Sequence, residues 1–359
     1  MQLTRGIMIT EQDPTKNQSI RQGSRDDYIE PLIWKFSSLT RNYALFHILY
    51  CVAGFLQLLS ILLFFSFFSK TTWSAVALAS LFLTAFSYFV LHFYFQAKKP
   101  QQFLELRQEF QTKYTHNTPL KTSASDIHME QARGFTSFAM HLDEKEGGYY
   151  PIPSFFQTLA PLMRKFSVFM HWKDVHKMKE LLLLSSINET VAVVKLMPTD
   201  LEAHANLANA YVCLAKIYKD PRTINSTSSL PWTSPEYASK IMQDKFHFAS
   251  DRAIEELTIL KEYSPDNPWV HHQLAQIYRE KNLEHLEIQE YETLLKIEES
   301  DNRLLHRLGI LYFKQGYNGK GLRVYQQMIE REESLAEDLI TYYNSFQFHE
   351  LSIESLSSR

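Results

Sequence analysis

Two long uncharged tracts dominate the distribution of apolar residues along the chain. Neither 42–69 nor 71–97 contains Asp, Glu, Lys or Arg, and Lys70 alone separates these two tracts. Each tract exceeds the roughly 20 apolar residues that a membrane-spanning helix needs. Buried helices of soluble proteins are rarely so long and so apolar. The pattern therefore predicts two transmembrane helices, 45–68 and 73–95, joined by a short loop as a hairpin.

The charges that flank this hairpin predict its orientation. Arg41 precedes the first tract and Lys98 and Lys99 follow the second, whereas the loop carries only Lys70. Because basic residues concentrate on the cytoplasmic side of a membrane, both termini are expected in the cytoplasm. The sequence thus predicts an integral membrane protein with two spans that contacts lipid through residues 45–95.

Few polar side chains interrupt the predicted spans. Gln57 lies inside the first span, and His47 and His92 lie near the cytoplasmic ends of the two spans. A polar side chain inside a bilayer usually bonds to a neighbouring helix, so we expect Gln57 to bond to the other span or to a second copy of the chain. Two helices with one polar residue at mid-depth do not predict a transport pathway.

The C-terminal half repeats itself at a fixed interval. The segment QLAQIY (273–278) recurs as RLGILY (307–312), and NLANAY (206–211) is a third copy that an insertion follows. At the same interval Tyr291 matches Tyr325. Self-similarity with a spacing of this size predicts an array of helical hairpins that stack on one another.

These segments resemble the tetratricopeptide repeat, a helix–turn–helix unit of about 34 residues. The small residues Ala208, Ala275 and Gly309 fit the positions where the two helices of a repeat approach closely. Glu287 stands where the family prefers Ala, so we expect that turn to pack loosely or to shift in register. The resemblance covers about 180–335 and implies a helical solenoid.

The predicted fold class is therefore all-α, a two-helix transmembrane hairpin followed by a solenoid of the tetratricopeptide type. The expected parts are a disordered cytoplasmic segment at 1–40, the hairpin at 41–99, a helical linker region at 100–179, the repeats at 180–346 and a frayed tail at 347–359. The repeats carry an insertion at about 219–250, rich in Ser, Thr and Pro at its start. Helices are expected at 101–116 and 125–142, and a capping helix at 335–346.

The resemblance also implies where a ligand would bind, because first helices of such repeats line a concave groove. The residues predicted on that face are Asn209, Gln273, Gln276, Arg303 and Arg307. Some family members clamp the C-terminal carboxylate of a peptide with two Asn and three basic residues. Asn209, Arg303 and Arg307 match that pattern, whereas Gln273 and Ala205 depart from it. We expect a polar or acidic segment of a protein partner here; a solvated groove without a specific ligand is the alternative.

Composition and motifs exclude several other classes. A net charge of −3 argues against a general nucleic-acid binder. Two cysteines, Cys51 and Cys213, are too few for a disulfide scaffold or a cysteine-based zinc finger. The sequence has no P-loop, dinucleotide-binding glycine turn, HExxH motif or nucleophile elbow. His171 and His176 are five apart in sequence, on different helix faces. We predict no catalytic, cofactor-binding or metal-binding residues and no small-molecule ligand.

Taken together, these features predict a membrane-anchored adaptor or scaffold that binds a protein partner at the cytoplasmic face. One alternative is a secreted bacterial effector inserted in a host-derived membrane. Two spans separated by a short loop resemble the bilobed hydrophobic segment of chlamydial inclusion-membrane proteins, a likeness that covers only 45–95. A further alternative is an enzyme whose site lies in the 100–180 region.

Overall fold

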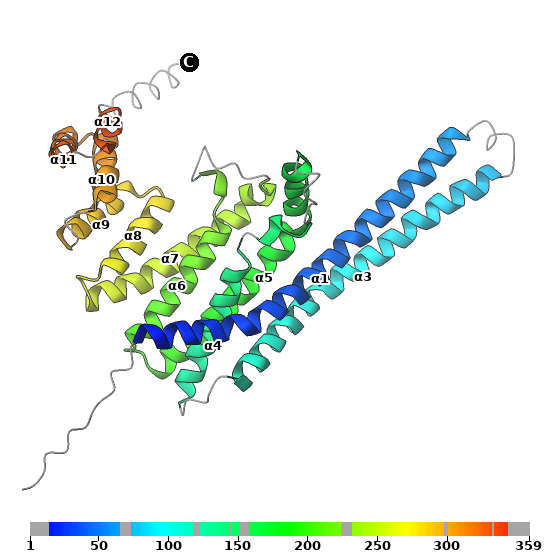
Figure 1. Cartoon of the computed structure of the whole chain (residues 1–359), viewed down its shortest axis with the longest axis horizontal. Coiled ribbons are helices and arrows are strands. Elements are labelled where there is room, and N and C mark those ends of the chain that lie inside the picture. Colours follow the sequence, from blue (N-terminus) through cyan, green and yellow to red (C-terminus); the bar gives the residue numbers. More distant parts are fainter. Residues whose placement is uncertain are drawn as a thin grey trace, which may run out of the picture. The chain divides into compact units, whose positions relative to one another are not determined.

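The structure, a computed structural model, describes the chain in two compact units (Figure 1). The described residues are 14–64, 73–117, 123–143, 145–150, 158–223, 232–297, 301–331 and 334–343. Within them every regular element is a helix, which confirms the predicted all-α class. Unit 1 comprises Met1–Val193 with Ser229–Ser234, and unit 2 comprises Val194–Ser228 with Pro235–Arg359. The domain limits drawn from the sequence stay a prediction.

Unit 1 is built on two long helices that lie side by side, α1 (Pro14–Leu63) and α3 (Trp73–Asn117). Helix α4 (Ala124–His141) packs against α3 and also contacts α1. After a single 3₁₀ turn at Lys145–Gly147, helix α5 (Ala160–Leu196) belongs to this unit as far as Val193. The helices expected at 101–116 and 125–142 therefore exist, the first as the continuation of α3.

The core of unit 1 lies on the part of α1 and α3 outside the uncharged tracts. Ile29, Leu32 and Phe36 are buried on one face of α1, at steps of three and four positions. Buried apolar side chains from the other helices complete this core: Phe103, Leu106, Phe110, Phe135, Phe138, Met178 and Leu182. The base of the hairpin is thus held by ordinary hydrophobic packing among four helices.

This packing corrects the expectation that residues 1–40 are disordered. The structure places α1 from Pro14 onward, and proline is favoured in a first helical turn because no helical partner is needed for its missing N–H. In the sequence before Arg41, charged residues lie among Ile29, Leu32 and Phe36, so the apolar face of this helix is not evident from composition. Residues 1–13 lie outside the described part of the chain.

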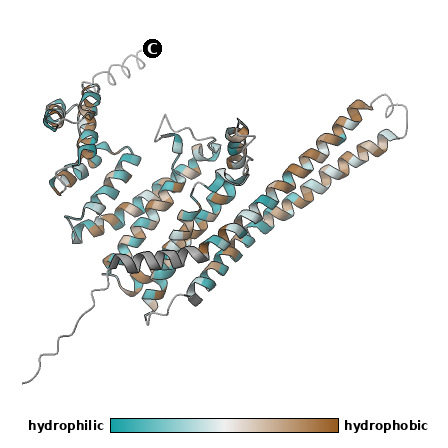
Figure 2. Ribbon diagram, in the orientation of Figure 1, coloured by the Kyte–Doolittle hydropathy of each residue, from teal (hydrophilic) through white to brown (hydrophobic). Residues whose placement is uncertain are grey.

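Beyond the base, both helices continue with mostly apolar residues (Figure 2), and many of these side chains are exposed. Leu62 is 73% exposed on α1, and Phe82 is 71% exposed on α3. The second predicted span begins at Trp73, where α3 begins. Helix α1 ends at Leu63, and the predicted end of the first span at Phe68 lies outside the described residues.

Polar side chains within the exposed tracts bond to one another across the hairpin. The Gln57 side-chain amide donates to Thr84 Oγ1 at 2.9 Å and to Ser80 Oγ at 3.3 Å. Near the base, His47 Nδ1 lies 3.2 Å from Tyr88 Oη, and the rings of His47 and His92 are 5.3 Å apart. The expectation that Gln57 bonds to the other span is confirmed.

Unit 2 has a helical-repeat fold in which successive helices pack as antiparallel pairs. Its helices are α6 (Leu201–Tyr218), α7 (Lys240–Tyr263), α8 (Pro268–Glu280), α9 (Glu284–Ile297), α10 (Asn302–Lys314), α11 (Asn318–Glu330) and α12 (Leu335–Ile340). The pairs are α6 with α7, α8 with α9, and α10 with α11. The first pair has the longest helices, and the 3₁₀ turns Pro221–Thr223 and Pro235–Ala238 lie between them.

Local signals recur with the repeat. The first helices are capped by Asp200, Asn267 and Asp301, whose side chains accept from backbone N–H groups two positions on. The turns after α8 and α10 place Asn282 and Gly316, one repeat apart, at positive φ angles of 57° and 77°. Asn and Gly are the residues that tolerate this conformation best, so the same turn closes both pairs.

Close helix approach explains Gly309 and the end of the array. A Cβ on Gly309 would lie 2.7 Å from Leu339 Cδ2 and 3.0 Å from Val324 Cγ1, both closer than carbon atoms pack. Leu339 is fully buried on α12 and joins the core of α9, α10 and α11. Helix α12 therefore covers the last pair. It begins at Leu335 as predicted but ends at Ile340, short of the predicted end at 346; residues 341–343 form a turn, and 344–346 lie outside the described residues.

The substitution Gly309→Leu is expected to destabilise unit 2 by about 1–3 kcal/mol, because the larger side chain overpacks this contact. Gly319→Leu is the matched control, since a Cβ there meets nothing within 4 Å. Thermal unfolding followed by circular dichroism on the full chain in mild detergent measures both. Equal melting temperatures for the two variants would contradict the assigned packing.

Candidate partner-binding site

The structure distributes the five predicted groove residues over three first helices. Asn209 lies on α6, Gln273 and Gln276 on α8, and Arg303 and Arg307 on α10. Gln276 and Arg303 are exposed, whereas the other three are half-buried. Their placement on successive first helices is the one that the repeat pattern predicts. A ligand bound to all of them stays a prediction.

Arg307 is already engaged within the protein. Its Nε and one terminal nitrogen bond to the two carboxylate oxygens of Glu287 at 3.0 and 3.2 Å. The Glu287 side chain is 0% exposed and Arg307 is half-buried, so the pair joins α9 to α10 with its carboxylate shielded from water. A bidentate guanidinium–carboxylate pair of this kind is geometrically specific. Arg307 is therefore a structural residue first, and Arg303 is the arginine that faces solvent.

The same pair explains how Glu287 is accommodated. In the preceding and following repeats the corresponding positions hold Ala253 and Gly321, both small and buried. The sequence led us to expect a loose or shifted turn at Glu287. Instead α9 keeps its place in the array, because Arg307 neutralises the buried carboxylate. The residue that corresponds to Arg307 in the preceding repeat is Gln273, so acid and base occur together in a single repeat.

A polar cavity of about 550 Å³ opens in unit 2 where the first helices end. Its lining comes from the ends of α6, α8 and α10 and the starts of α7 and α9, and it includes these charged residues: Lys219, Asp220, Arg279, Glu280, Lys281, Glu284, Glu287, Arg307 and Lys314. Lys219 Nζ lies 3.3 Å from a Glu280 oxygen. Burial lowers the pKa of Lys219, although Glu280 opposes that shift.

Sequence reasoning assigned Arg307 but missed the rest of this cavity. The available signal was the basic residue in or just after the last turn of each first helix, Lys219, Lys281 and Lys314, where positive charge stabilises the exposed carbonyl groups. Positive charges at three helix ends favour an acidic ligand. The lining carboxylates limit that preference.

One buried histidine near the start of α6 and one near the start of α8 bond to the neighbouring helix and to the preceding loop. His204 Nδ1 lies 2.6 Å from Glu256 and its Nε2 lies 3.0 Å from the Pro198 carbonyl oxygen. His271 makes the same two contacts with Glu290 and Pro265, at 2.6 and 2.7 Å. Burial lowers the pKa of His204. The hydrogen bonds to Glu256 and to the Pro198 carbonyl oxygen raise it, and the net pKa is above its usual value. These histidines tie helices together.

Unit 1 holds another buried histidine, His171, for which the sequence predicted no catalytic or metal-binding role. His171 stacks on Tyr149 with ring centroids 3.9 Å apart, and its Nε2 lies 3.0 Å from Tyr150 Oη. Burial lowers the pKa of His171 to about 4 and raises that of Tyr149 to about 12, so both are neutral near pH 7. Among the described residues no group of three or more His, Cys, Asp or Glu side chains could hold a metal ion.

Comparison with known protein families gives no match, and comparison with curated protein sequences gives none either. Among solved structures, one similar chain is the assembly chaperone of RpL4 (Acl4), residues 1–338. The two share 11% sequence identity, and the alignment covers 74% of this chain and 97% of that chain with a TM-score of 0.26. A likeness at this TM-score carries no argument about function.

Replacing Arg307 alone is expected to destabilise unit 2 more than replacing Glu287 and Arg307 together. Arg307→Gln leaves a buried carboxylate unpaired and should lower the free energy of unfolding by about 3–5 kcal/mol. The double variant Glu287→Ala/Arg307→Gln copies Ala253 and Gln273 of the preceding repeat and should recover most of that loss. Urea unfolding of the full chain in detergent measures each variant. A double variant that is no more stable than Arg307→Gln would show that the two side chains do not act as a pair.

Proposed function

We propose that this protein is a membrane-anchored adaptor in which the α1–α3 hairpin spans the bilayer and unit 2 binds a segment of a partner protein. The hairpin supplies no chemistry of its own in this proposal. Anchoring raises the local concentration of the repeats beside partners at the same membrane, so a groove of modest affinity suffices.

The proposed membrane insertion rests mainly on the exposed apolar surface of the hairpin. Within the described residues, two helices are long and apolar enough to cross a membrane, and none of their most apolar window is buried. A core helix of a soluble protein would have that surface covered. Apolar surface in water costs about 25 cal/mol per Å², so a hairpin of this length calls for lipid around it. The Gln57 amide nitrogen finds both of its acceptors within the hairpin, whereas its amide oxygen is buried without a partner there.

The charge pattern supports an orientation with both termini in the cytoplasm. Arg41 and the pair Lys98–Lys99 lie at the base of the hairpin, next to the packed core, and Lys70 lies in the loop between the helices. In this orientation the repeats of unit 2 and the packed base of unit 1 need not be moved across the membrane.

The repeats support the binding role. Three helix pairs with the same caps, of which the last two also share the repeat interval and the turn, are similar to the tetratricopeptide architecture, which presents its first helices to partners. Arg303 and Gln276 are the exposed members of the predicted set, and the cavity at the helix ends adds further basic groups. We propose an acidic or polar protein segment as the ligand, without catalysis, nucleic acid or cofactor.

Cysteine labelling tests insertion and orientation together. In a background with Cys51→Ala and Cys213→Ala, Thr71→Cys should react with a membrane-impermeant maleimide in intact cells of an expression host. Gln108→Cys, an exposed position on α3 beyond the apolar tract, should react only after permeabilisation. Protection of both positions would mean that the hairpin does not cross the membrane, and the reverse pattern would invert the orientation.

Site-specific photocrosslinking tests the groove. A photoreactive amino acid at Gln276 or Arg303 should crosslink the same partner, because both side chains are exposed on first helices. The matched control is Gln289, which is exposed on the second helix α9. Arg303→Glu should weaken capture about tenfold or more, equivalent to about 1.4 kcal/mol. Equal crosslinking from Gln289, or capture that Arg303→Glu leaves unchanged, would remove the groove from the proposal.

A further inference from the structure

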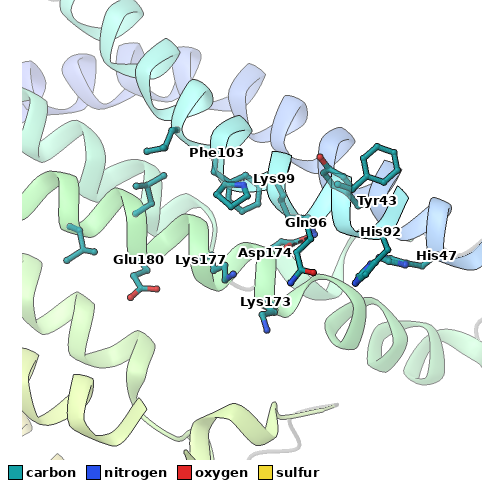
Figure 3. Close-up of a pocket in the computed structure, with 15 residues that line it drawn as sticks. Tyr43, His47, His92, Gln96, Lys99, Phe103, Lys173, Asp174, Lys177 and Glu180 are labelled. Carbon is teal, nitrogen blue, oxygen red and sulfur yellow. Dashed lines mark hydrogen bonds and ion pairs between the residues drawn. The ribbon is translucent and has the colours of Figure 1, made fainter. Parts of the chain in front are cut away.

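A second cavity, of about 590 Å³, lies at the base of the hairpin, entirely within unit 1 (Figure 3). It is bounded by α1, α3 and α5. Apolar side chains form most of its walls, and charged side chains of α5 lie along one edge. Its size suits a ligand much larger than a simple ion. None of the groove residues considered above contributes to it.

The charges around this cavity leave it positive. The Lys99 ammonium bonds to both oxygens of Asp174, at 3.0 and 2.9 Å, so these two charges cancel. Lys173 and Lys177 lie four positions apart on α5, on one face of the helix, and both are exposed. Glu180 is the other carboxylate of the lining. Counting the Lys, Asp and Glu side chains, the lining therefore carries one net positive charge.

A backbone acceptor adds to this edge. Pro100 lies inside α3 and lines the cavity. Because proline has no N–H, the carbonyl group of Gln96, four positions earlier, lacks its usual helical partner. Gln96 lines the same cavity. A ligand that carries hydroxyl or ammonium groups beside an anion would find both kinds of partner here.

Apolar side chains surround the cavity on the side that faces the uncharged tracts of α1 and α3. Figure 3 shows α3 and α5 passing the cavity in the same direction, from His92 to Phe103 on one and from Lys173 to Glu180 on the other. The part of α5 before Lys173 therefore lies toward the uncovered tracts. On that part Phe169 is 58% exposed and Leu162 is 63% exposed. An apolar surface next to lysines is typical of a segment at the level of lipid headgroups.

We infer that this cavity binds the headgroup of an anionic phospholipid, with its phosphodiester held by Lys173 and Lys177. The acyl chains run past Phe95 toward the apolar tracts, and the glycerol backbone lies near Gln96. The inference rests on the proposed insertion of the hairpin. Lysine ammonium groups bind phosphate strongly as compact charges, and anionic lipids concentrate at the cytoplasmic surface where the proposed orientation places this site.

Native mass spectrometry of the full chain in a non-ionic detergent tests the assignment. Phosphatidylglycerol should bind at least about fivefold more tightly than phosphatidylcholine of the same acyl length. Lys173→Gln/Lys177→Gln should abolish that preference. The matched control Arg164→Gln/Lys165→Gln removes the same charge from the same helix outside the cavity and should keep it. Circular dichroism should show equal helicity for all three proteins.

Other outcomes would overturn the assignment. Equal binding of the two lipids would mean that the cavity does not select an anionic headgroup. An equal loss of the phosphatidylglycerol preference in both double variants would mean general electrostatic attraction to the helix only. Displacement of the lipid by millimolar glycerol 3-phosphate would assign the site to a soluble phosphate compound. Insertion is read separately by the Thr71→Cys labelling. If that labelling succeeds and the lipid preference is absent, the inference fails alone; if labelling fails, the anchor itself is wrong.

Discussion

The continuity of α1 and α3 as helices is the constraint on which unit 1 depends, although Pro31 and Pro100 each remove one backbone hydrogen bond. A helix bonds its own N–H and C=O groups internally, so it can pass from a packed core into apolar surroundings without ending. Here each helix does both: Phe36 and Phe110 are buried in the base, and Leu62 and Phe82 are exposed further along. Helices α4 and α5 pack on the base, so the position of the second cavity follows from where the two long helices change their surroundings.

Unit 2 obeys a different constraint, the distance at which paired helices approach. Ala208, Ala275 and Gly309 are small residues at equivalent positions of the repeats, and at Gly309 any added carbon would collide with Leu339 of the last helix. A second position, on the second helices, is small in two of the repeats, at Ala253 and Gly321, and Glu287 departs from the rule there. The array tolerates it because Arg307 supplies a charge-matched partner from the next helix. One repeat thus replaces close packing with a buried ion pair while its neighbours keep small residues.

Much of this fold follows from the sequence, and the reasons for the exceptions are physical. The uncharged tracts, the repeat interval and the Asp and Asn caps are local signals, so the starts of α3 at Trp73 and of α12 at Leu335 were predictable. The helix before Arg41 was missed because its apolar face is narrow and lies among charges. Contacts between residues far apart in the chain, such as Lys99 with Asp174, depend on how α5 packs, which no local pattern specifies.

The continuation of α3 as one helix beyond its apolar tract also has a mechanical consequence. Past Phe95 the helix runs on to Asn117, a length of roughly 33 Å at about 1.5 Å per residue. Spanning helices tilt by about 20° on average, and more where the bilayer is thinner than the apolar stretch. A change of about 20° in tilt would swing the far end of α3 by about 11 Å. In the proposed arrangement, bilayer thickness therefore sets the distance between α4 and the lipid surface through the tilt of α3.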